Sequence, residues 1–266
     1  MTLHDDVHAR IARMAARPDA ASPAALNDML RLMAKWRSAM IQNTILKQDG
    51  TVVPRGPLAG LDFLERSAEG CHAAKLIGTY EQPLHPHVKA AIAGGYDTIL
   101  NIGCAEGYYA VGMARRMPET RALAFDLDPN ARATCAALAT RNGVADRITI
   151  GELFTPADFA VHAGARTLVF CDIEGGEDAL LDPLAAPALA GMDLIVESHE
   201  CLKPGLTRRL CDRFAATHDI TVVEDDGQRG IADAPEWFRG LAHLDQLLAT
   251  WEWRSGPTPW LVMTAR

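Results

Sequence analysis

The sequence lacks any apolar run that approaches the roughly 20 residues a helix needs to cross a bilayer. Its first segment, 1–17, carries too many charged side chains for the apolar core of a signal peptide. These two absences predict a cytoplasmic protein without a membrane partner.

Zinc-type cysteine spacing is also absent. The chain has six cysteines, but no two of them form a C-x-x-C pair. In a reducing compartment we interpret all six as free thiols that serve mainly as small core residues.

A basic surplus is missing as well. The chain has 26 lysine and arginine residues against 34 aspartate and glutamate residues, which gives a net charge of −8. General nucleic-acid binders usually carry a surplus of basic residues. This balance, together with the absence of an Asn-Pro-Pro-Tyr-type motif, disfavours nucleic acid as a partner.

What the sequence does contain is a change of pattern near residue 95. Hydrophobic residues make up 48% of the 266 residues, as in an ordinary globular protein. Ser22 followed by Pro23 forms a suitable helix start. Residues 1–95 are therefore expected to form a helical N-terminal extension that serves as a lid or a dimerisation region. Helices are predicted over 7–17, 24–36 and 61–76.

From residue 96 onward, short apolar strands alternate with helical stretches. The predicted strands are 98–102, 121–125, 148–150, 167–170, 194–196, 220–224 and 260–264. The predicted helices between them are 109–117, 131–141, 179–184 and 207–216. Such alternation is typical of a parallel sheet covered by helices on both faces. We expect residues 96–266 to form a doubly wound α/β catalytic domain with a mostly parallel seven-stranded sheet, whose ligands bind beyond the carboxyl ends of the strands.

The first predicted strand ends in a glycine turn with the sequence Gly103-Cys104-Ala105-Glu106-Gly107. Glycine lets the backbone turn sharply and approach a ligand closely. The turn lacks the third glycine of the dinucleotide fingerprint G-x-G-x-x-G and the Lys-Ser/Thr of a P-loop. Glu106 stands where a pyrophosphate would want no negative charge. It suits a ligand with a cationic amino group instead, such as S-adenosylmethionine.

The second predicted strand ends at Asp126, which lies 19 positions after Gly107. A carboxylate at this place can accept hydrogen bonds from both hydroxyls of a ribose. Asp128, followed by Pro129, is predicted to cap the next helix. The glycine turn and Asp126 together favour a cofactor that contains a nucleoside.

These segments resemble the class I S-adenosylmethionine-dependent methyltransferases and, more narrowly, the FkbM-type family. Four stretches between residues 97 and 200 carry the resemblance: Leu100-Asn101-Ile102-Gly103-Cys104-Ala105-Glu106-Gly107, Ala124-Phe125-Asp126-Leu127-Asp128-Pro129, Cys171-Asp172-Ile173-Glu174-Gly175-Gly176-Glu177 and Ile195-Val196-Glu197-Ser198-His199. Asp126 departs from the pattern, because many relatives carry glutamate there, and it shortens the reach of the side chain.

The resemblance implies where the cofactor lies. Asp126 would bind the ribose, and Leu127 would pack on the adenine. Asp172 would lie close to the methyl group and the acceptor. The residues near the adenine edge would be Gly151, Glu152 and Leu153. The methionine part of the cofactor would be lined by Gly103, Cys104, Ala105 and Gly107.

Polar side chains follow the predicted fourth and fifth strands. Asp172, Glu174 and His199 are candidates for removing a proton from the acceptor. Asp172, Glu197 and His199 are candidates for holding a divalent cation such as Mg²⁺. Two simpler roles stay open, namely Glu174 and Glu177 as the acidic start of a helix and His199 as a hydrogen-bonded loop residue.

The segment 79–87 mixes polar and aromatic side chains and suits a lid over the cofactor. Tyr80 and Glu81 are candidates for contact with the methionine end or with the acceptor. His85 and His87, one residue apart across a proline, are a poor arrangement for chelating a metal.

The sequence therefore predicts an S-adenosylmethionine-dependent methyltransferase that acts on a hydroxyl of a small molecule, such as a sugar or polyketide, with a divalent cation in support. The alternatives are an N-methyltransferase, a nucleic-acid methyltransferase and an NAD-binding oxidoreductase. A non-catalytic scaffold is opposed by the acidic groups at the strand ends. Whether the N-terminal helices cover the active site or form a homodimer contact stays open.

Overall fold

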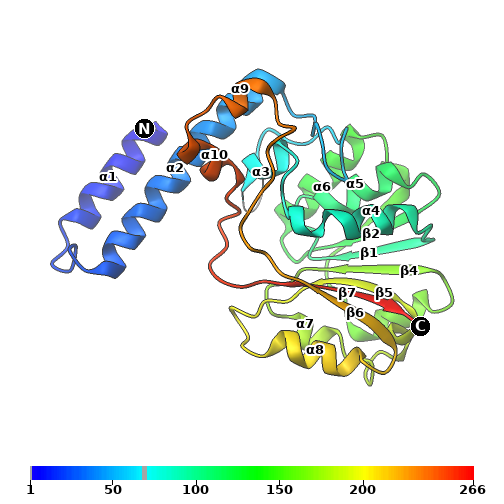
Figure 1. The fold of residues 1–266 in the computed structure, drawn as a ribbon. Coiled ribbons are helices and arrows are strands. Elements are labelled where there is room, and N and C mark those ends of the chain that lie inside the picture. Colours follow the sequence, from blue (N-terminus) through cyan, green and yellow to red (C-terminus); the bar gives the residue numbers. More distant parts are fainter. Residues whose placement is uncertain (1, 68–70) are drawn as a thin grey trace.

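A seven-stranded sheet forms the core of the protein, whose computed structural model describes residues 2–67 and 71–266. The strand order is β3-β2-β1-β4-β5-β7-β6, and β7 runs antiparallel to both of its neighbours (Figure 1). The predicted mostly parallel, doubly wound sheet is confirmed. The strands are β1 (Thr98–Ile102), β2 (Arg121–Phe125), β3 (Ile148–Gly151), β4 (Thr167–Cys171), β5 (Asp193–Glu197), β6 (His218–Val223) and β7 (Trp260–Ala265).

The register of the sheet brings the ends of its central strands to one edge. Ile102 at the end of β1 pairs with Phe125 of β2 and with Cys171 of β4. Cys171 in turn pairs with Val196 of β5. The residues that follow these four strands therefore emerge side by side, which is where a doubly wound sheet binds its ligands.

Helices cover both faces of the sheet. On one face lie α4 (His85–Ala93), α5 (Tyr108–Arg116) and α6 (Pro129–Arg141) (Figure 1). On the other face lie α7 (Glu177–Leu180) and α8 (Leu206–Phe214) (Figure 1). A separate hydrophobic cluster fills each of the two layers. Short 3₁₀ helices occur at Gln82–Leu84, Ala145–Arg147, Pro156–His162 and Pro187–Gly191.

Two of the predicted helices are shorter in the structure than expected. The helix predicted over 179–184 ends at Leu180, because the residue before Pro183 is disfavoured in the helical region. Of the helix predicted over 61–76, only α3 (His72–Leu76) is helical, and residues 68–70 lie outside the described residues. The preceding backbone pairs with an earlier segment instead, since the Phe63 N–H donates to the Thr51 carbonyl.

The N-terminal helices form a hairpin that projects from the rest of the molecule (Figure 1). It consists of α1 (Leu3–Ala15) and α2 (Pro23–Asp49). The predicted helix start is confirmed, because the Ser22 hydroxyl accepts a hydrogen bond from the Ala25 N–H. Helix α2 continues well beyond the predicted end at residue 36, since its second half packs on the body of the protein.

A late segment of the chain returns to these helices. Helices α9 (Glu236–Arg239) and α10 (His243–Thr250) follow β6, and α10 packs on α2 and α3. Arg37 of α2 and Asp245 of α10 form an ion pair at 2.6 Å. The division of the chain at residue 95 stays a prediction. Within the described residues, no helix combines the length and apolarity needed to cross a membrane.

Candidate active site

Two neighbouring cavities lie at the carboxyl edge of the sheet. The first, here called the acidic cavity, has a volume of about 410 Å³ and is lined by Asp172, Glu174, Glu197, His199 and Glu252 among others. The second, here called the apolar cavity, has a volume of about 520 Å³, and its lining includes Phe125, Leu127, Leu153, Phe154 and Leu180. Both cavities share Gly103, Asp172 and Glu174 in their walls, so they adjoin each other at the glycine turn.

The glycine turn after β1 packs directly on the end of β4. Gly103 has a φ of 77°, and a Cβ at this position would lie 1.6 Å from the Asp172 carbonyl oxygen. Gly107 has a φ of 89°, and a Cβ there would lie 2.6 Å from the Cys135 sulfur. Only glycine fits either position, and Ala105 between them also has a positive φ of 46°. The turn is thus held in one conformation beside the cavities.

Asp126 connects the end of β2 to the glycine turn. Its carboxylate accepts hydrogen bonds from the Ala105 N–H and the Asp128 N–H, each at 2.8 Å. A carboxylate has about four lone-pair sites, so two stay available for donors from a ligand. Asp128 caps α6 through a hydrogen bond from the Asn130 N–H, which confirms its predicted role.

The apolar cavity is lined by unusually exposed hydrophobic side chains. Leu127, after β2, is 67% exposed, and Leu153, after β3, is 63% exposed. Both belong to the cavity wall, as does Glu152, which lies 3.6 Å from Arg132. Exposed leucines on two neighbouring loops are suited to hold a flat apolar group between them.

Glu106 lies outside the linings of both cavities. Its side chain is fully buried and forms an ion pair with Lys75, and it also accepts a hydrogen bond from Ser67. A protein ammonium group therefore already contacts the carboxylate that the sequence suggested for a cationic ligand. The nearby Cys104 and Ala105 do line the acidic cavity.

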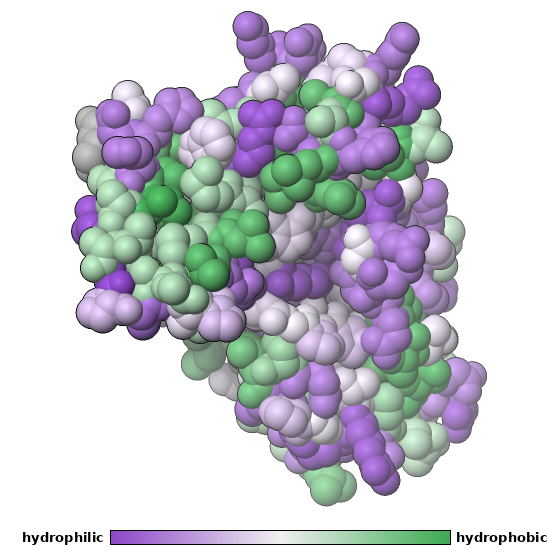
Figure 2. All heavy atoms as spheres, turned by 60° about the vertical axis from the view of Figure 1, so that its left-hand side comes forward, coloured by the Kyte–Doolittle hydropathy of each residue, from purple (hydrophilic) through white to green (hydrophobic). Residues whose placement is uncertain are grey.

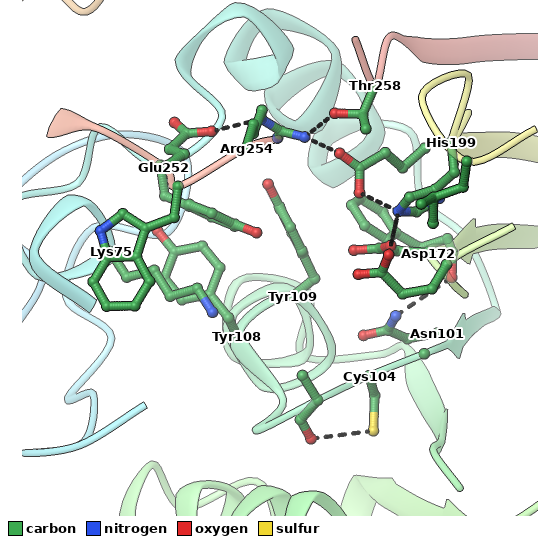
Figure 3. Close-up of a pocket in the computed structure, with 18 of the residues that line it drawn as sticks. Lys75, Asn101, Cys104, Tyr108, Tyr109, Asp172, His199, Glu252, Arg254 and Thr258 are labelled. Atoms are coloured by element: carbon green, nitrogen blue, oxygen red, sulfur yellow. Dashed lines mark hydrogen bonds and ion pairs between the residues drawn. The ribbon is translucent and has the colours of Figure 1, made fainter. Parts of the chain in front are cut away.

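Asn101 of β1 is a site residue that the sequence reasoning missed. It is 2% exposed and lines the acidic cavity. Its amide nitrogen donates to the Phe170 carbonyl, whereas its Oδ1 is buried and accepts no hydrogen bond from any described residue (Figure 3). A buried acceptor of this kind is costly unless a ligand supplies a donor.

His199 lies beside Asp172 on one wall of the acidic cavity (Figure 3), and four carboxylates lie close to its ring nitrogens. Its Nδ1 is 2.9 Å from the buried Glu177, and because a carboxylate can only accept, the imidazole donates here. Its Nε2 faces Glu174 at 3.3 Å, Asp172 at 3.5 Å and Glu197 at 3.6 Å. Glu177 thus fixes the ring so that Nε2 points to the other acids.

The predicted metal ligands stay a prediction, and the structure offers a candidate set that differs from them in one position. Asp172, Glu174 and His199 place ligand atoms within 4.8 Å of one another. Glu197, which the sequence suggested as the third ligand, forms an ion pair with Arg254. Glu174 has a φ of 53°, a conformation that is strained for a residue other than glycine and that often marks a functional site.

Crowding of negative charge alters the acid–base properties of this wall. Burial, reinforced by the charges of Glu197 and Glu81, raises the pKa of Asp172 well above its usual range. Burial opposes the charged form of His199, but the hydrogen bond to Glu177 and the neighbouring carboxylates raise its pKa above the ordinary histidine value. The wall therefore holds protons more readily than usual and favours a positively charged group beside it.

The opposite wall is formed by the predicted lid and by residues 250–258, here called the strap. Tyr80 lines the acidic cavity, and its contact with a ligand stays a prediction. Glu81 is buried with a φ of 51°, accepts a hydrogen bond from the Tyr109 hydroxyl, and pairs with Arg254 of the strap at 3.0 Å. Arg254 also reaches Glu252 and Thr258 (Figure 3).

Of the strap residues, the sequence suggested Trp251 and Trp253 for a substrate wall or for packing of the terminal strands, and Trp253 does line the acidic cavity, whereas Arg254 gave no signal. Arg254 lies 57 positions after Glu197, and nothing in its surroundings forms a motif. Trp253 has a φ of 61°, and its ring lies 4.7 Å from the ammonium group of Lys35 in α2. The strap is thus attached both to the site and to the hairpin.

No protein-family model and no curated protein sequence matches the chain. Among solved structures, a provisionally named O-methyltransferase from Klebsiella pneumoniae is similar over 88% of this chain and 99% of its own, with 15% identity and a TM-score of 0.50. The chain has the Rossmann-like fold of methyltransferases.

Two further similar structures hold a cofactor or its product. The O-methyltransferase TomG from Streptomyces achromogenes, in complex with S-adenosylmethionine, matches 70% of this chain and 79% of its own at 17% identity, with a TM-score of 0.47. The Bacillus cereus O-methyltransferase, in complex with S-adenosylhomocysteine, matches 70% of this chain and 81% of its own at 14% identity, with a TM-score of 0.47. The narrower resemblance to the FkbM-type family stays a prediction.

Proposed function

We propose that the protein is an S-adenosylmethionine-dependent methyltransferase that transfers the methyl group to a hydroxyl of a small molecule. The observation that carries this proposal is the pair of cavities that meet at Gly103 and Asp172. One is apolar and has a carboxylate at its rim, which suits an adenosine. The other is lined by more carboxylates than lysine and arginine side chains, which suits a sulfonium ion.

The residues present fit the cofactor. Leu127 and Leu153 would enclose the adenine, and Asp126 would accept hydrogen bonds from the ribose hydroxyls. Asn101 would supply its unpaired Oδ1 to the ammonium group at the methionine end. When bound, the cofactor supplies a methyl group on a good leaving group, so the protein mainly has to position the acceptor.

A divalent cation also fits the donor set. Asp172, Glu174 and His199 provide oxygen and imidazole ligands, and Glu177 orients the histidine as the carboxylate neighbours of metal-binding histidines do. Such a cation would lower the pKa of an acceptor hydroxyl. The protein's own contribution is to hold the acceptor against this wall and to exclude water with Tyr80 and the strap.

The acceptor is proposed to be a sugar, polyketide or other natural-product hydroxyl, in line with the FkbM-type resemblance. A small-molecule partner and a cytoplasmic location belong to the same proposal. The acidic lining of the acceptor side opposes a nucleic acid, whose phosphates need a basic surface.

Calorimetric titration with S-adenosylhomocysteine tests this function without knowledge of the acceptor. We expect micromolar binding by the purified chain and no comparable binding of NAD⁺. A second titration with Mn²⁺, after treatment with a chelator, tests the cation site separately. Binding of NAD⁺ in preference to S-adenosylhomocysteine would replace the methyltransferase by the oxidoreductase alternative.

A further inference from the structure

One lysine and one glutamate pair with each other inside the protein. Hydrophilic residues are spread over the face of the molecule that Figure 2 shows, where lysine and glutamate are usually found. Lys75 of α3 is nevertheless only 4% exposed, and Glu106 of the glycine turn is fully buried. They form an ion pair, and the Ser67 hydroxyl accepts from Lys75 and donates to Glu106. Because desolvation of both charges offsets their attraction, stability alone does not explain such a pair.

The two members of the pair differ in what they face. Lys75 lines the acidic cavity together with Asn101, Cys104 and Tyr108 (Figure 3). Glu106 lies outside the linings of both cavities. Burial opposes the charged form of Lys75, but the charge of Glu106 raises its pKa above the ordinary lysine value. The cavity wall therefore contains an ammonium group whose counter-ion is not part of that wall.

The ammonium group of Lys75 is held in position on several sides. It lies 4.8 Å from the centre of the Tyr80 ring and 5.8 Å from that of the Tyr108 ring, within the range of cation–π contacts. A lysine ammonium group has three N–H groups. Glu106 and Ser67 accept two of them, and the residues that the structure describes provide no hydrogen-bond acceptor for the third. One donor thus stays available for a ligand in the cavity.

Arg254, the other lysine or arginine side chain in the described lining of this cavity, is already occupied. Its guanidinium forms ion pairs with four carboxylates, those of Glu81, Glu197, Asp225 and Glu252. An anionic group of a ligand would meet repulsion from these carboxylates. Lys75, with one carboxylate beside it, is the better counter-ion for such a group.

We propose that Lys75 binds the carboxylate of the amino-acid half of S-adenosylmethionine, an inference that rests on the proposed function. This half of the cofactor carries an ammonium group and a carboxylate on the same carbon atom, so it needs an acceptor and a cation on one cavity wall. The unpaired Oδ1 of Asn101 suits the ammonium group, and Lys75 suits the carboxylate.

The start of α5 supports this placement of the carboxylate. Tyr108 and Tyr109 begin the helix and line the acidic cavity. The helix has no side-chain cap among the described residues, so its first N–H groups and its dipole favour a negative group there. The positive end of α5 and the ammonium group of Lys75 thus meet at the same wall.

Glu106 is a positioning residue in this arrangement. The sequence suggested it for contact with a cationic ligand, but its carboxylate contacts Lys75 instead. It keeps the lysine charged in a buried place and fixes the ammonium group beside the cavity. The glutamate of the glycine turn therefore acts on the cofactor through the lysine.

Two ligands that differ only in the carboxylate test the proposal. They are S-adenosylhomocysteine and its decarboxylated analogue, in which a hydrogen atom replaces the carboxylate. In calorimetric titration, the wild type is expected to bind S-adenosylhomocysteine about 30-fold more tightly than the analogue, as for a hydrogen bond between charged groups. Equal binding of the two ligands by the wild type overturns the proposal, whether or not any variant folds.

The double variant Lys75→Met/Glu106→Gln removes the ion pair without leaving a buried charge unpaired. Its preference for S-adenosylhomocysteine is expected to fall from about 30-fold to about threefold, the remainder coming from the start of α5. Arg208→Met/Asp212→Asn removes an exposed ion pair outside the cavities and is expected to keep the wild-type preference. An equal loss of affinity for both ligands in the first variant would mean that the pair only supports the glycine turn, which overturns the proposal.

The same titrations separate this inference from the proposed function. A wild type that binds neither ligand contradicts the proposed function, and the role of Lys75 with it. A wild type that binds S-adenosylhomocysteine, with a preference that the double variant retains, contradicts the role of Lys75 alone and leaves the proposed function in place.

Discussion

The two cavities of the site are built in different ways. The apolar cavity is lined mainly by residues that follow β1, β2, β3 and β4, among them Asp126, Leu153 and Asp172, so most of its lining lies at strand ends that the sequence pattern indicates. The acidic cavity draws its charges from after β4, from the end of β5 and just after it, and from the strap, whose Arg254 pairs with the buried Glu81. One half is made by local structure, and the other is assembled by the tertiary fold.

The difference also concerns energetics. In the apolar cavity, Asp126 is satisfied by two backbone N–H groups and the leucines need only a ligand to cover them. In the acidic cavity, carboxylates are buried close together, which is costly unless cations compensate them. Changes in the acidic cavity should therefore have larger effects and should depend on pH.

The largest expected effect is on the cation site. Asp172→Asn keeps the shape of the side chain but replaces a carboxylate, which a cation can hold in its charged form, by a neutral amide. It is therefore expected to weaken Mn²⁺ binding by about 100-fold or more, beyond the 10- to 100-fold typical of groups that merely orient ligands. Calorimetry with Mn²⁺ measures this. S-adenosylhomocysteine should bind both proteins with similar affinity.

Two matched variants compare Glu174 and Glu197 as candidates for the third cation ligand. Glu174→Gln should weaken Mn²⁺ binding more than Glu197→Gln does, because Glu197 is occupied by Arg254. The opposite order would restore Glu197 as the third ligand. An unchanged affinity in Asp172→Asn would remove the cation from the proposed function.

Much of the fold could be predicted because its signals are local. Strands 98–102 and 121–125 were predicted to the residue, since each is a short apolar run bounded by turn residues. The first part of the helix predicted over 61–76 is wrong, because Leu61 and Phe63 pair with an earlier segment instead of forming a helix. Tertiary packing decided that region, and no local pattern indicates it.

Site residues that directly follow strands could also be predicted, whereas those brought in by long-range pairings could not. Asp126, Asp172 and His199 follow strands, so their convergence can be argued from topology alone. The pairing of Glu106 with Lys75 joins residues 31 positions apart, and that of Arg254 with Glu197 joins residues 57 apart. Pairings of this kind depend on how loops return to the sheet, which the sequence pattern does not contain.

The next largest effect is expected at Asp126, the proposed ribose-binding residue of the apolar cavity. Asp126→Ala removes charge-assisted hydrogen bonds to a ligand and the hold on the glycine turn, so S-adenosylhomocysteine should bind about 30-fold more weakly. Asp128→Ala is the matched control: it removes the cap of α6 and should cost about 1 kcal/mol of stability with little change in affinity. Equal affinity of Asp126→Ala and the wild type would contradict the ribose role.

The stability of the protein should depend on pH through Glu81, which lies beside the acidic cavity. Burial, reinforced by the charge of Glu197, raises the pKa of Glu81 to about 8. Between pH 4.5 and 8 the unfolded chain loses this proton while the folded chain keeps it, so the free energy of unfolding falls as pH rises. Between pH 5 and pH 7, the free energy of unfolding of the wild type should fall by about 1 to 2 kcal/mol relative to that of Glu81→Gln. This is less than the full 1.4 kcal/mol per pH unit, because neighbouring groups change their protonation as well.

Thermal unfolding at a series of pH values measures this change. The difference in Tm between the wild type and Glu81→Gln should shift by a few degrees across the range, because about 1 kcal/mol corresponds to 2–4 °C in a chain of this size. Glu119→Gln, an exposed position, should show a constant difference. A constant difference for Glu81→Gln as well would mean that Glu81 is ionised throughout.

The smallest expected effect concerns the wall of the apolar cavity. Leu127 is mostly exposed, so Leu127→Ala should leave the Tm almost unchanged, whereas a buried leucine would cost several kcal/mol. If an adenine covers this side chain, its loss should weaken S-adenosylhomocysteine binding by about fivefold, which corresponds to roughly 1 kcal/mol of apolar contact. Leu184→Ala, equally apolar and 92% exposed elsewhere, should change neither quantity. Since stability and affinity respond separately here, a drop in Tm without a loss of affinity would show that Leu127 supports the fold instead of the ligand.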